Sequence, residues 1–240
     1  MAKKGIVLSS GGCDSTVCVG LAVAALGAEN VSTVSIVYGQ KHSRELECAR
    51  KVANHYGCEH YEFDLSEIFK SSNCSLLSSS SEEVPEGSYD EQIGRADNGK
   101  VATYVPFRNG LMLSTVAALA MSLYPDDEVS IYIGAHADDA AGNAYADCSP
   151  EFSAAMHEAI RIGTYGQATV ETPLIHLNKA EVVKKGLELK VPFALTTSCY
   201  NGREKACGKC GTCIDRIAAF KVNDAIDPIE YEIDVFGESK

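Results

Sequence analysis

The stretch Ser10-Gly-Gly-Cys-Asp-Ser15 combines a glycine pair, two hydroxyl groups and a carboxylate between two apolar segments. Residues 5–9 predict a buried parallel strand, and residues 16–26 have helical length. Glycines at such a junction allow a tight turn and leave the first N–H groups of the helix without intrahelical partners. With the helix dipole, these donors form a phosphate-sized anion site. An ordinary helix N-cap needs only one such residue, so the pattern favours phosphate binding.

Four cysteines, Cys199, Cys207, Cys210 and Cys213, have the spacing C-x7-C-x2-C-x2-C. Two residues between ligands let a tight turn aim two thiolates at one ion, and the upstream cysteine closes a tetrahedron. We therefore expect one structural Zn²⁺ per chain, held by residues 198–220. An iron–sulfur cluster is the main alternative because C-x2-C-x2-C also begins ferredoxin motifs, which continue with a Cys-Pro that this chain lacks. A pair of disulfides is a third and weaker alternative.

Composition limits the class of protein. The 240 residues are 45% hydrophobic, enough for a single domain over residues 1–240 with one substantial core. The apolar runs are too short for membrane spans, so we expect a cytoplasmic protein without membrane contacts. The formal net charge of −12 argues against stable nucleic-acid binding, which requires clustered Lys and Arg.

Strand and helix signals alternate along the chain. Strand patterns lie at residues 31–37, 60–63 and 129–133, and helical patterns lie at 44–56, 110–123 and 178–189. This order predicts an α/β fold, a Rossmann-like parallel sheet with helices on both faces. The loops that begin near Ser10, Tyr38 and Gly134 are expected to converge at the carboxyl ends of the strands. Residues 64–100 form a polar insertion, which is either a lid over this edge or a solvated loop.

The Ser-Gly-Gly-x-Asp-Ser pattern resembles the PP-loop of ATP pyrophosphatases; the Walker spacing is absent. Further segments together resemble the 7-cyano-7-deazaguanine synthase family, from the loop to Phe220: Tyr38-Gly-Gln-Lys-His42, Val105-Pro-Phe-Arg-Asn109, Asp147-Cys148 with Pro150-Glu-Phe152, and Ser198-Cys-Tyr200. That family usually has Arg, Gly, Pro and often Arg where this chain has Lys41, Phe107, Ala146 and Ser149.

The resemblance implies an adenine nucleotide α-hydrolase-like fold with a zinc-stapled C-terminal segment. It implies ATP-dependent conversion of 7-carboxy-7-deazaguanine and ammonia to the nitrile through adenylated intermediates, a step in queuosine precursor biosynthesis. ATP with Mg²⁺ is then a cosubstrate, the partners are a small deazaguanine and ammonia, and a homodimer is expected.

The same resemblance and the chemistry of the side chains define candidate site residues. The catalytic candidates are Asp14, Ser15, Arg108 and Asp147. The nucleotide-binding candidates are Ser9, Ser10, Gly11, Gly12, Cys13, Asp14, Ser15, Thr16, Tyr38, Gln40 and His42. The candidates for the deazaguanine are Arg108, Asn109, Asp139, Tyr145, Asp147, Glu151 and Phe152. Carboxylates can accept from the guanine-like edge, aromatic rings can stack on its face, and Arg108 can bind its carboxylate or a phosphate. Phe152 is alternatively a core residue, and Asn109 a helix cap.

Two other functions share part of this pattern. An adenylating amide ligase of the NAD synthetase kind would use the same loop but would not need the four cysteines. A PP-loop tRNA thiolase would use the cysteine cluster as a zinc module for tRNA, which the acidic composition disfavours.

Overall fold

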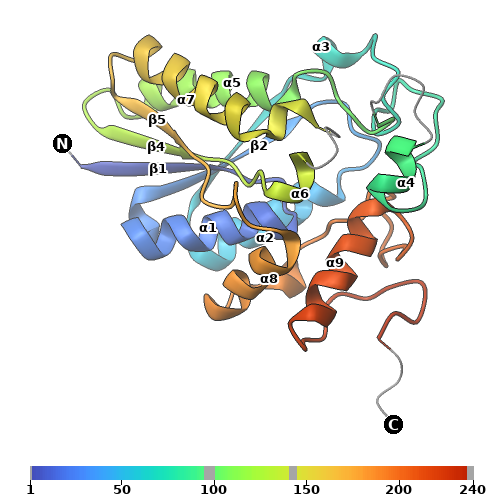
Figure 1. The fold of residues 1–240 in the computed structure, drawn as a ribbon. Coiled ribbons are helices and arrows are strands. Elements are labelled where there is room, and N and C mark those ends of the chain that lie inside the picture. The colour runs from blue at the N-terminus through green and yellow to red at the C-terminus, as the bar shows by residue number, and fades with distance from the viewer. Residues whose placement is uncertain (1, 95–100, 141–144, 237–240) are drawn as a thin grey trace.

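The structure, a computed structural model, describes residues 2–94, 101–140 and 145–236 (Figure 1). Its centre is a parallel sheet of five strands in the order β3-β2-β1-β4-β5, which confirms the predicted fold class. The strands are β1 (Lys3–Leu8), β2 (Val31–Val37), β3 (Glu59–Asp64), β4 (Glu128–Tyr132) and β5 (Ala168–Glu171).

Helices cover both faces of the sheet (Figure 1). On one face lie α1 (Cys13–Leu26), α2 (Arg44–Tyr56) and α8 (Lys179–Glu188), and on the other lie α5 (Arg108–Leu123) and α7 (Pro150–Gly163). The side chains of β1 alternate between these layers, as the strand period requires. Val7 packs in the core with α1 and α8, whereas Ile6 and Leu8 pack in the core with α5 and α7. Helix α9 (Gly211–Val222) packs beside α8.

The remaining elements are short. They are η1 (Ala28–Asn30), α3 (Ser66–Phe69), α4 (Tyr89–Gly94), α6 (Ala137–Ala140), η3 (Ala146–Cys148) and η4 (Phe193–Leu195).

The predicted strands and helices are all present, with small shifts at their ends. Helix α1 begins at Cys13 rather than at Thr16, because Gly12 is its extended N-cap residue and already accepts the first intrahelical bond from Thr16 N. Gly57 ends α2 in the left-handed conformation. Strand β5 and helix α9 were not predicted.

The chain order places a crevice beside β1. The chain runs outward from β1 through β2 to β3, and then crosses to the other side of β1 to form β4 and β5. Neighbouring crossovers therefore diverge between β1 and β4, the position where parallel sheets commonly bind ligands at their carboxyl ends. The loop that begins at Ser9 and the loop that begins at Ile133 both lie at this point.

The described part of the insertion, residues 64–94, contains both buried and exposed residues; residues 95–100 lie outside the described residues. Phe69, Cys74 and Leu77 form a small buried core with Tyr38. The backbone N–H of Gly87 donates to Lys209 O at 3.1 Å, so the insertion also contacts the cysteine-rich segment. Its action as a lid stays a prediction.

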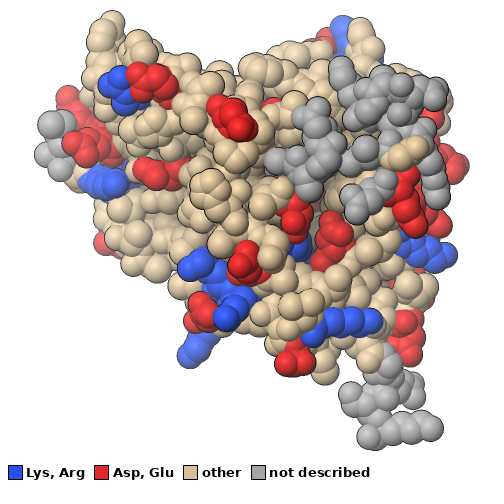
Figure 2. Space-filling view, in the orientation of Figure 1, with Lys and Arg blue, Asp and Glu red and all other residues tan. Residues whose placement is uncertain are grey.

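Across residues 2–94, 101–140 and 145–236, no helix is both long and apolar enough to cross a bilayer. On the face drawn in Figure 2, the blue Lys and Arg groups are small and lie among red Asp and Glu side chains. A continuous basic surface is not seen there among the described residues.

Candidate active site

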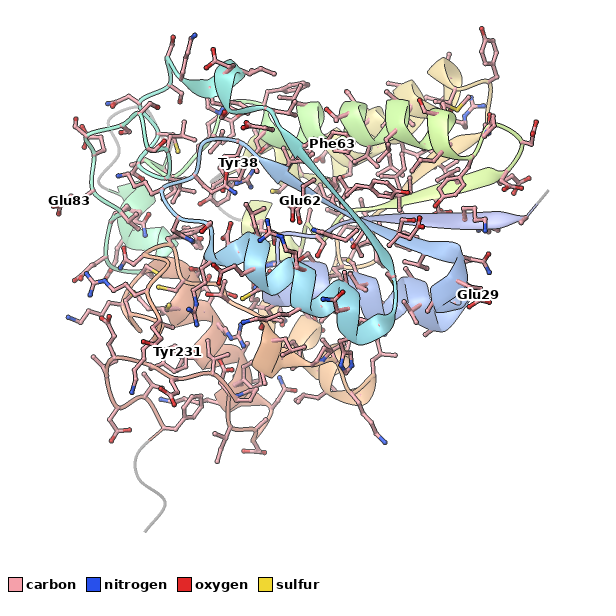
Figure 3. The ribbon with its side chains drawn as sticks, turned by 180° about the vertical axis from the view of Figure 1, so that it is seen from behind. Glu29, Tyr38, Glu62, Phe63, Glu83 and Tyr231 are labelled. Carbon is pink, nitrogen blue, oxygen red and sulfur yellow. The ribbon has the colours of Figure 1, made fainter. Side chains whose placement is uncertain are left out.

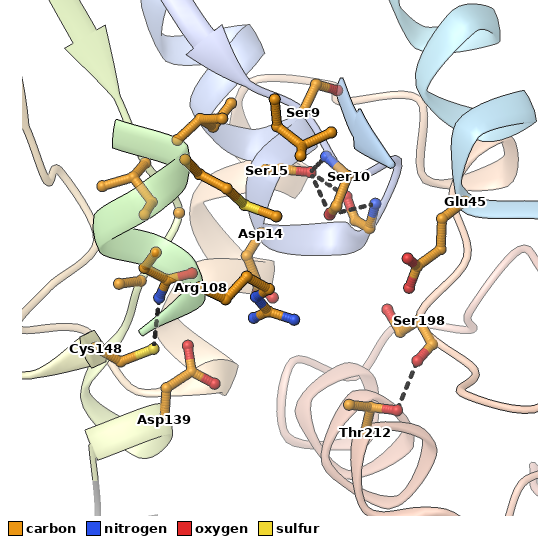
Figure 4. A pocket seen from close by; sticks show the side chains of 18 of the residues that line it. Ser9, Ser10, Asp14, Ser15, Glu45, Arg108, Asp139, Cys148, Ser198 and Thr212 are labelled. Atoms are coloured by element: carbon orange, nitrogen blue, oxygen red, sulfur yellow. Dashed lines mark hydrogen bonds between the residues drawn. The ribbon is translucent and has the colours of Figure 1, made fainter. Parts of the chain in front are cut away.

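One cavity at the carboxyl ends of the strands collects residues from many parts of the chain (Figure 4). These parts include β2, the loops after β1, β2 and β4, the starts of α2, α5 and α8, one residue each of α4 and η3, and residues 197–215. Ten of the predicted site residues line the cavity: Ser9, Ser10, Gly12, Asp14, Ser15, Tyr38, Gln40, Arg108, Asn109 and Asp139. Eight others lie outside its lining: Gly11, Cys13, Thr16, His42, Tyr145, Asp147, Glu151 and Phe152.

The loop after β1 is held in a compact turn by its own hydroxyl groups. Ser15 Oγ accepts from Ser10 N at 3.2 Å and lies 3.1 Å from Ser10 Oγ, which in turn accepts from Gly12 N at 3.2 Å. Gly11 has φ +75°, and a Cβ atom there would lie 2.2 Å from Glu45 O and 2.6 Å from Ala49 N. Only glycine fits this contact with α2, so α2 fixes the shape of the loop.

Asp14 is paired with a lysine that the sequence analysis missed. Lys179 Nζ lies 2.6 Å from both carboxylate oxygens of Asp14, and its side chain is only 10% exposed. Burial alone would raise the pKa of Asp14, but Lys179 and the nearby His136 outweigh it and hold the pKa below its ordinary value. Burial would lower the pKa of Lys179, and Asp14 reverses this, so both groups are charged at neutral pH.

The position of Lys179 follows from the start of α8. Asn178 and Glu181 form a reciprocal capping box, with Asn178 Oδ1 accepting from Glu181 N at 2.9 Å. Lys179 is therefore the first residue of the helix, where the dipole disfavours a cation. The sequence Asn178-Lys-Ala-Glu181 shows a lysine directly after a capping asparagine. This pattern was the one signal that could have pointed to a functional role for Lys179, and it is weak.

Three more carboxyl groups line the cavity. Burial raises the pKa of Glu45 to about 7, against the opposing effect of Arg108. Burial also raises the pKa of Asp215 to about 6, opposed by Lys179. The pKa of Asp139 is raised by burial and opposed by His136, whose Nε2 lies 3.5 Å from Asp139 Oδ1. Sequence analysis missed Glu45 and Asp215, because each looks like an ordinary polar position of a helix.

Arg108 is a half-buried cation at the start of α5, on the opposite face of the sheet from α2. Its guanidinium lies over the ring of Tyr38, 5.3 Å from the centroid, and Cys148 also lines the cavity nearby. The Arg108 Nε atom is buried and has no hydrogen-bond partner in the described part of the chain. In Figure 4 the guanidinium points into the cavity, with Glu45 on one side and Asp139 on the other. An orphaned buried donor here is suited to an anionic ligand.

The segment from Tyr145 to Phe152 supports the start of α5. Asp147 is 6% exposed, and its Oδ2 accepts from Asn109 N at 2.9 Å. Asn109 Nδ2 donates back to Asp147 O at 3.0 Å and to Cys148 Sγ at 3.2 Å. The carboxylate predicted to read the substrate edge is thus bound to the helix start that carries Arg108.

Two other predicted residues of this segment, Tyr145 and Phe152, also have protein partners. Tyr145 OH lies 2.6 Å from Thr103 Oγ1, and Phe152 packs edge-on against Phe107 with ring centroids 5.7 Å apart. Glu151 is exposed in the first turn of α7. Phe107 has φ 53°, an unfavourable value for a non-glycine residue, at the position where the family usually has glycine.

Three predicted nucleotide-binding residues, Cys13, Thr16 and His42, lie outside the cavity lining. Cys13 is fully buried in the core, and burial raises the pKa of its thiol to about 12. Thr16 Oγ1 donates to Gly12 O at 2.7 Å and so stabilises the helix start. His42 has a buried Nδ1 without a hydrogen-bond partner in the described residues, and burial lowers its pKa.

The four cysteines of the C-terminal segment come together as expected. Their sulfur atoms lie within 4.8 Å of one another, and Cys207 Sγ is 3.9 Å from Cys213 Sγ. A tetrahedron with metal–sulfur bonds of about 2.3 Å has edges of roughly 3.8 Å. Backbone N–H groups of Cys207, Lys209 and Cys210 donate to Cys199 or Cys207 sulfur at 3.3–3.4 Å, which favours thiolates. The donor set therefore fits a four-coordinate metal ion.

The fold and this cavity define an α/β protein of the PP-loop class. A family model described as "Queuosine biosynthesis protein QueC" matches residues 4–224, and the chain belongs to this family. It is similar to a 7-cyano-7-deazaguanine synthase from Marinomonas sp. (strain MWYL1), with 40% identity over 97% of this chain and 100% of the relative. A second synthase of that name, from Oceanobacillus iheyensis, is 42% identical over 95% of this chain and 98% of the relative.

Among solved structures, the chain is similar to an NH3-dependent NAD synthetase from Campylobacter jejuni, with 17% identity and a TM-score of 0.47. The similarity covers 92% of this chain and 75% of that one.

Proposed function

We propose that this chain converts 7-carboxy-7-deazaguanine and ammonia into 7-cyano-7-deazaguanine at the expense of ATP, a step in making the queuosine precursor. The observation that carries the proposal is a single cavity that contains both the anion loop and Arg108, whose buried Nε has no hydrogen-bond partner among the described residues. One group suits a pyrophosphate and the other a substrate carboxylate. Family membership and the names of the relatives support this particular acceptor.

The chemistry needs the same activation twice. A substrate carboxylate oxygen attacks the α-phosphorus of ATP, pyrophosphate leaves, and a mixed anhydride with AMP forms. Ammonia attacks the carbonyl carbon, loses a proton and expels AMP, which gives the amide. The amide oxygen then attacks a second ATP, and loss of AMP and the nitrogen-bound protons gives the nitrile. Both activations release pyrophosphate, so one anion loop serves both.

The loop and its surroundings are the proposed ATP site. Helix α1 has 14 residues, and its positive end points at the loop formed by Ser9 to Ser15. Lys179 adds a fixed positive charge beside Asp14 for the phosphates. Among the predicted nucleotide contacts, Tyr38 and Gln40 line the cavity. Gly11, Cys13, Thr16 and His42 support it from outside the lining.

Two metal ions belong to the proposal. Mg²⁺ prefers carboxylate oxygens and enters with ATP, where it offsets phosphate charge. Asp14 and Asp139, both in the cavity wall, are the carboxylates placed to hold it. For the cysteine cluster we assign Zn²⁺, because four thiolates with tetrahedral spacing close the coordination shell and leave no open position for catalysis.

The two sides of the cavity suit the two ends of the acceptor. Arg108 holds the carboxylate, with Asn109 and Asp139 beside it. Glu45 approaches from α2 on the other side (Figure 4), and no hydrogen bond ties its carboxylate to another described residue. When ionised, Glu45 can accept from the N–H and amino edge of the deazaguanine. Asp147 acts indirectly by fixing the start of α5.

A substrate panel tests the proposed function. The protein would be incubated with ATP, Mg²⁺ and ammonium, and separately with 7-carboxy-7-deazaguanine, deamido-NAD or tRNA, the tRNA reaction also containing sulfide as the sulfur donor. We expect the nitrile from the deazaguanine and no amidated or thiolated product from the other two. Arg108→Gln removes the proposed carboxylate partner and should abolish the product, whereas Lys184→Met, at an exposed position of α8, should not. Amidation of deamido-NAD, or thiolation of tRNA, would contradict the proposed function.

A further inference from the structure

Outside the cavity, a completely buried ion pair joins α9 to the C-terminal segment. Arg216 Nε lies 2.6 Å from Asp227 Oδ2, the second guanidinium contact to Asp227 is 2.9 Å, and both side chains are 0% exposed. Tyr231 OH, on the C-terminal segment labelled in Figure 3, donates to the same Asp227 at 2.7 Å. Buried ion pairs are often no more stabilising than apolar residues of the same volume, so such a pair calls for a specific role.

The remaining Arg216 contacts reach residues 196–198, called here the connecting segment, and Phe193 O, to which the other terminal nitrogen donates at 3.3 Å. One terminal nitrogen donates to Thr196 Oγ1 at 2.8 Å and lies 3.4 Å from Ser198 Oγ. Thr212, also on α9, donates from Oγ1 to Ser198 O at 2.6 Å. Helix α9 therefore fixes both ends of the connecting segment.

The connecting segment in turn touches the anion loop. Thr197 N donates to Gly11 O at 2.9 Å, which is a direct backbone contact to the first loop glycine. Thr197 and Ser198 line the cavity, whereas Thr196 is 4% exposed and lies outside the lining. The segment continues directly into Cys199, and Cys213 lies on α9 one helical turn before Arg216.

We propose that Arg216 is a positioning residue for the anion loop, acting through the connecting segment. Its planar guanidinium has fixed donors, so it sets the position of Thr196 and Ser198 relative to α9. The backbone bond from Thr197 then fixes the carbonyl of Gly11 and the direction of the loop N–H groups. The cysteine cluster anchors α9 and Cys199 at the same place, so it contributes to ATP binding as well as to stability. This inference rests on the proposed binding of ATP at the loop.

A matched pair of variants separates positioning from general stability. Thr196→Val removes the Arg216 contact on the loop side, together with the bond from Thr196 Oγ1 to Phe193 O at 2.7 Å, without changing the shape of the side chain or the cavity lining. Tyr231→Phe removes one bond from the same Arg216–Asp227 network on the side away from the loop. Both variants should lower the melting temperature. We expect Thr196→Val to weaken ATP binding about tenfold, the effect of losing a hydrogen bond to a charged group, and Tyr231→Phe to change it less than about twofold.

Calorimetry with ATP and Mg²⁺, without acceptor, gives the affinity directly, and scanning calorimetry gives the melting temperature. If Thr196→Val does not fold, Thr196→Ala removes the same Arg216 contact with a smaller side chain outside the cavity lining and carries the same expectation. Unchanged ATP affinity in the folded Thr196→Val or Thr196→Ala protein, or equal weakening in Tyr231→Phe, would overturn the inference. Absence of ATP binding by the unaltered protein would instead overturn the proposed function.

Discussion

Lys179 Nζ lies 2.6 Å from both carboxylate oxygens of Asp14, although the two residues are 165 positions apart in the chain. The pair joins the start of α8 to the anion loop. A buried charge that loses its partner destabilises a protein by about 3–5 kcal/mol. Asp14 therefore supports both the proposed phosphate site and the stability of the fold.

The ion pair leads to the first prediction. Lys179→Met should lower the free energy of unfolding by about 3 kcal/mol, the low end for a lost buried partner because the Asp14 side chain is 24% exposed. It should also abolish turnover, because it leaves Asp14 with only His136, whose Nε2 is 3.8 Å from Asp14 Oδ2. The double variant Asp14→Asn with Lys179→Met should recover most of the stability but none of the activity. Denaturant unfolding and product formation are measured on each. The control is Lys184→Met, an exposed position of the same helix. Turnover by the double variant would refute the role of this pair.

The cysteine cluster gives the second prediction. Elemental analysis should find about one zinc per chain, since four thiolates complete a tetrahedron. Cys207→Ser should lose the metal and lower the melting temperature. The matched control is Cys58→Ser, which changes a buried cysteine outside the cluster and should keep the metal. Stoichiometric iron with visible absorption, or a metal-free protein of full stability, would contradict the zinc assignment.

The support of α5 by Asp147 gives the third prediction. Asp147→Ala removes the acceptor of the Asn109 N–H bond and should raise the KM for the deazaguanine about tenfold, the scale of one buried unpaired donor. The affinity for ATP should stay within about twofold. Glu151→Gln changes an exposed carboxylate of the same segment and should have no effect. If Glu151→Gln raised the KM for the deazaguanine and Asp147→Ala did not, the proposed indirect role of Asp147 would be wrong.

Glu45 gives a prediction about pH. Burial raises the pKa of Glu45 to about 7, so the group is mostly protonated below pH 7 and becomes an acceptor of N–H bonds as pH rises. The KM for the deazaguanine should therefore fall between pH 6 and pH 8, and Glu45→Gln should remove this change. The stability of the fold should change with pH in the opposite direction to substrate binding. Because the pKa of Glu45 is raised in the folded state, Glu45 favours folding at low pH, and this contribution is lost as the pH rises to 7. A pH profile unchanged in Glu45→Gln would exclude Glu45 from the acceptor site.

An analogue sharpens this test. A deazaguanine that lacks the 2-amino group removes one proposed donor to Glu45. The unaltered protein should bind the analogue more weakly, whereas Glu45→Gln should bind both compounds equally. If Glu45→Gln weakened ATP binding instead, Glu45 would face the nucleotide.

The parts of the molecule that depend on local sequence were predictable. The anion loop and the cysteine spacing are contiguous patterns whose geometry follows from glycine turns and helix starts. The parallel sheet followed from alternating strand and helix signals. Strand β5 was missed because four residues, Ala168–Glu171, are too short to show a period.

The rest of the site depends on contacts between distant segments. Glu45, Lys179 and Asp215 lie at polar positions of helices, and only the tertiary fold turns them into the cavity. For Asp147 the residue type suggested a substrate contact, but a carboxylate near a helix start serves equally well as an acceptor for a backbone N–H. The homodimer and the cytoplasmic location stay predictions.

Oxygen labelling tests the proposed reaction most directly. 7-Carboxy-7-deazaguanine with ¹⁸O in both carboxylate oxygens would be incubated with the protein, ATP, Mg²⁺ and ammonium, and all products analysed by mass. Because each activation leaves one substrate oxygen on phosphorus, we expect two AMP molecules per nitrile, each with one ¹⁸O, together with unlabelled pyrophosphate. Unlabelled AMP, or ADP with labelled phosphate, would contradict activation of the substrate by adenylation at this site.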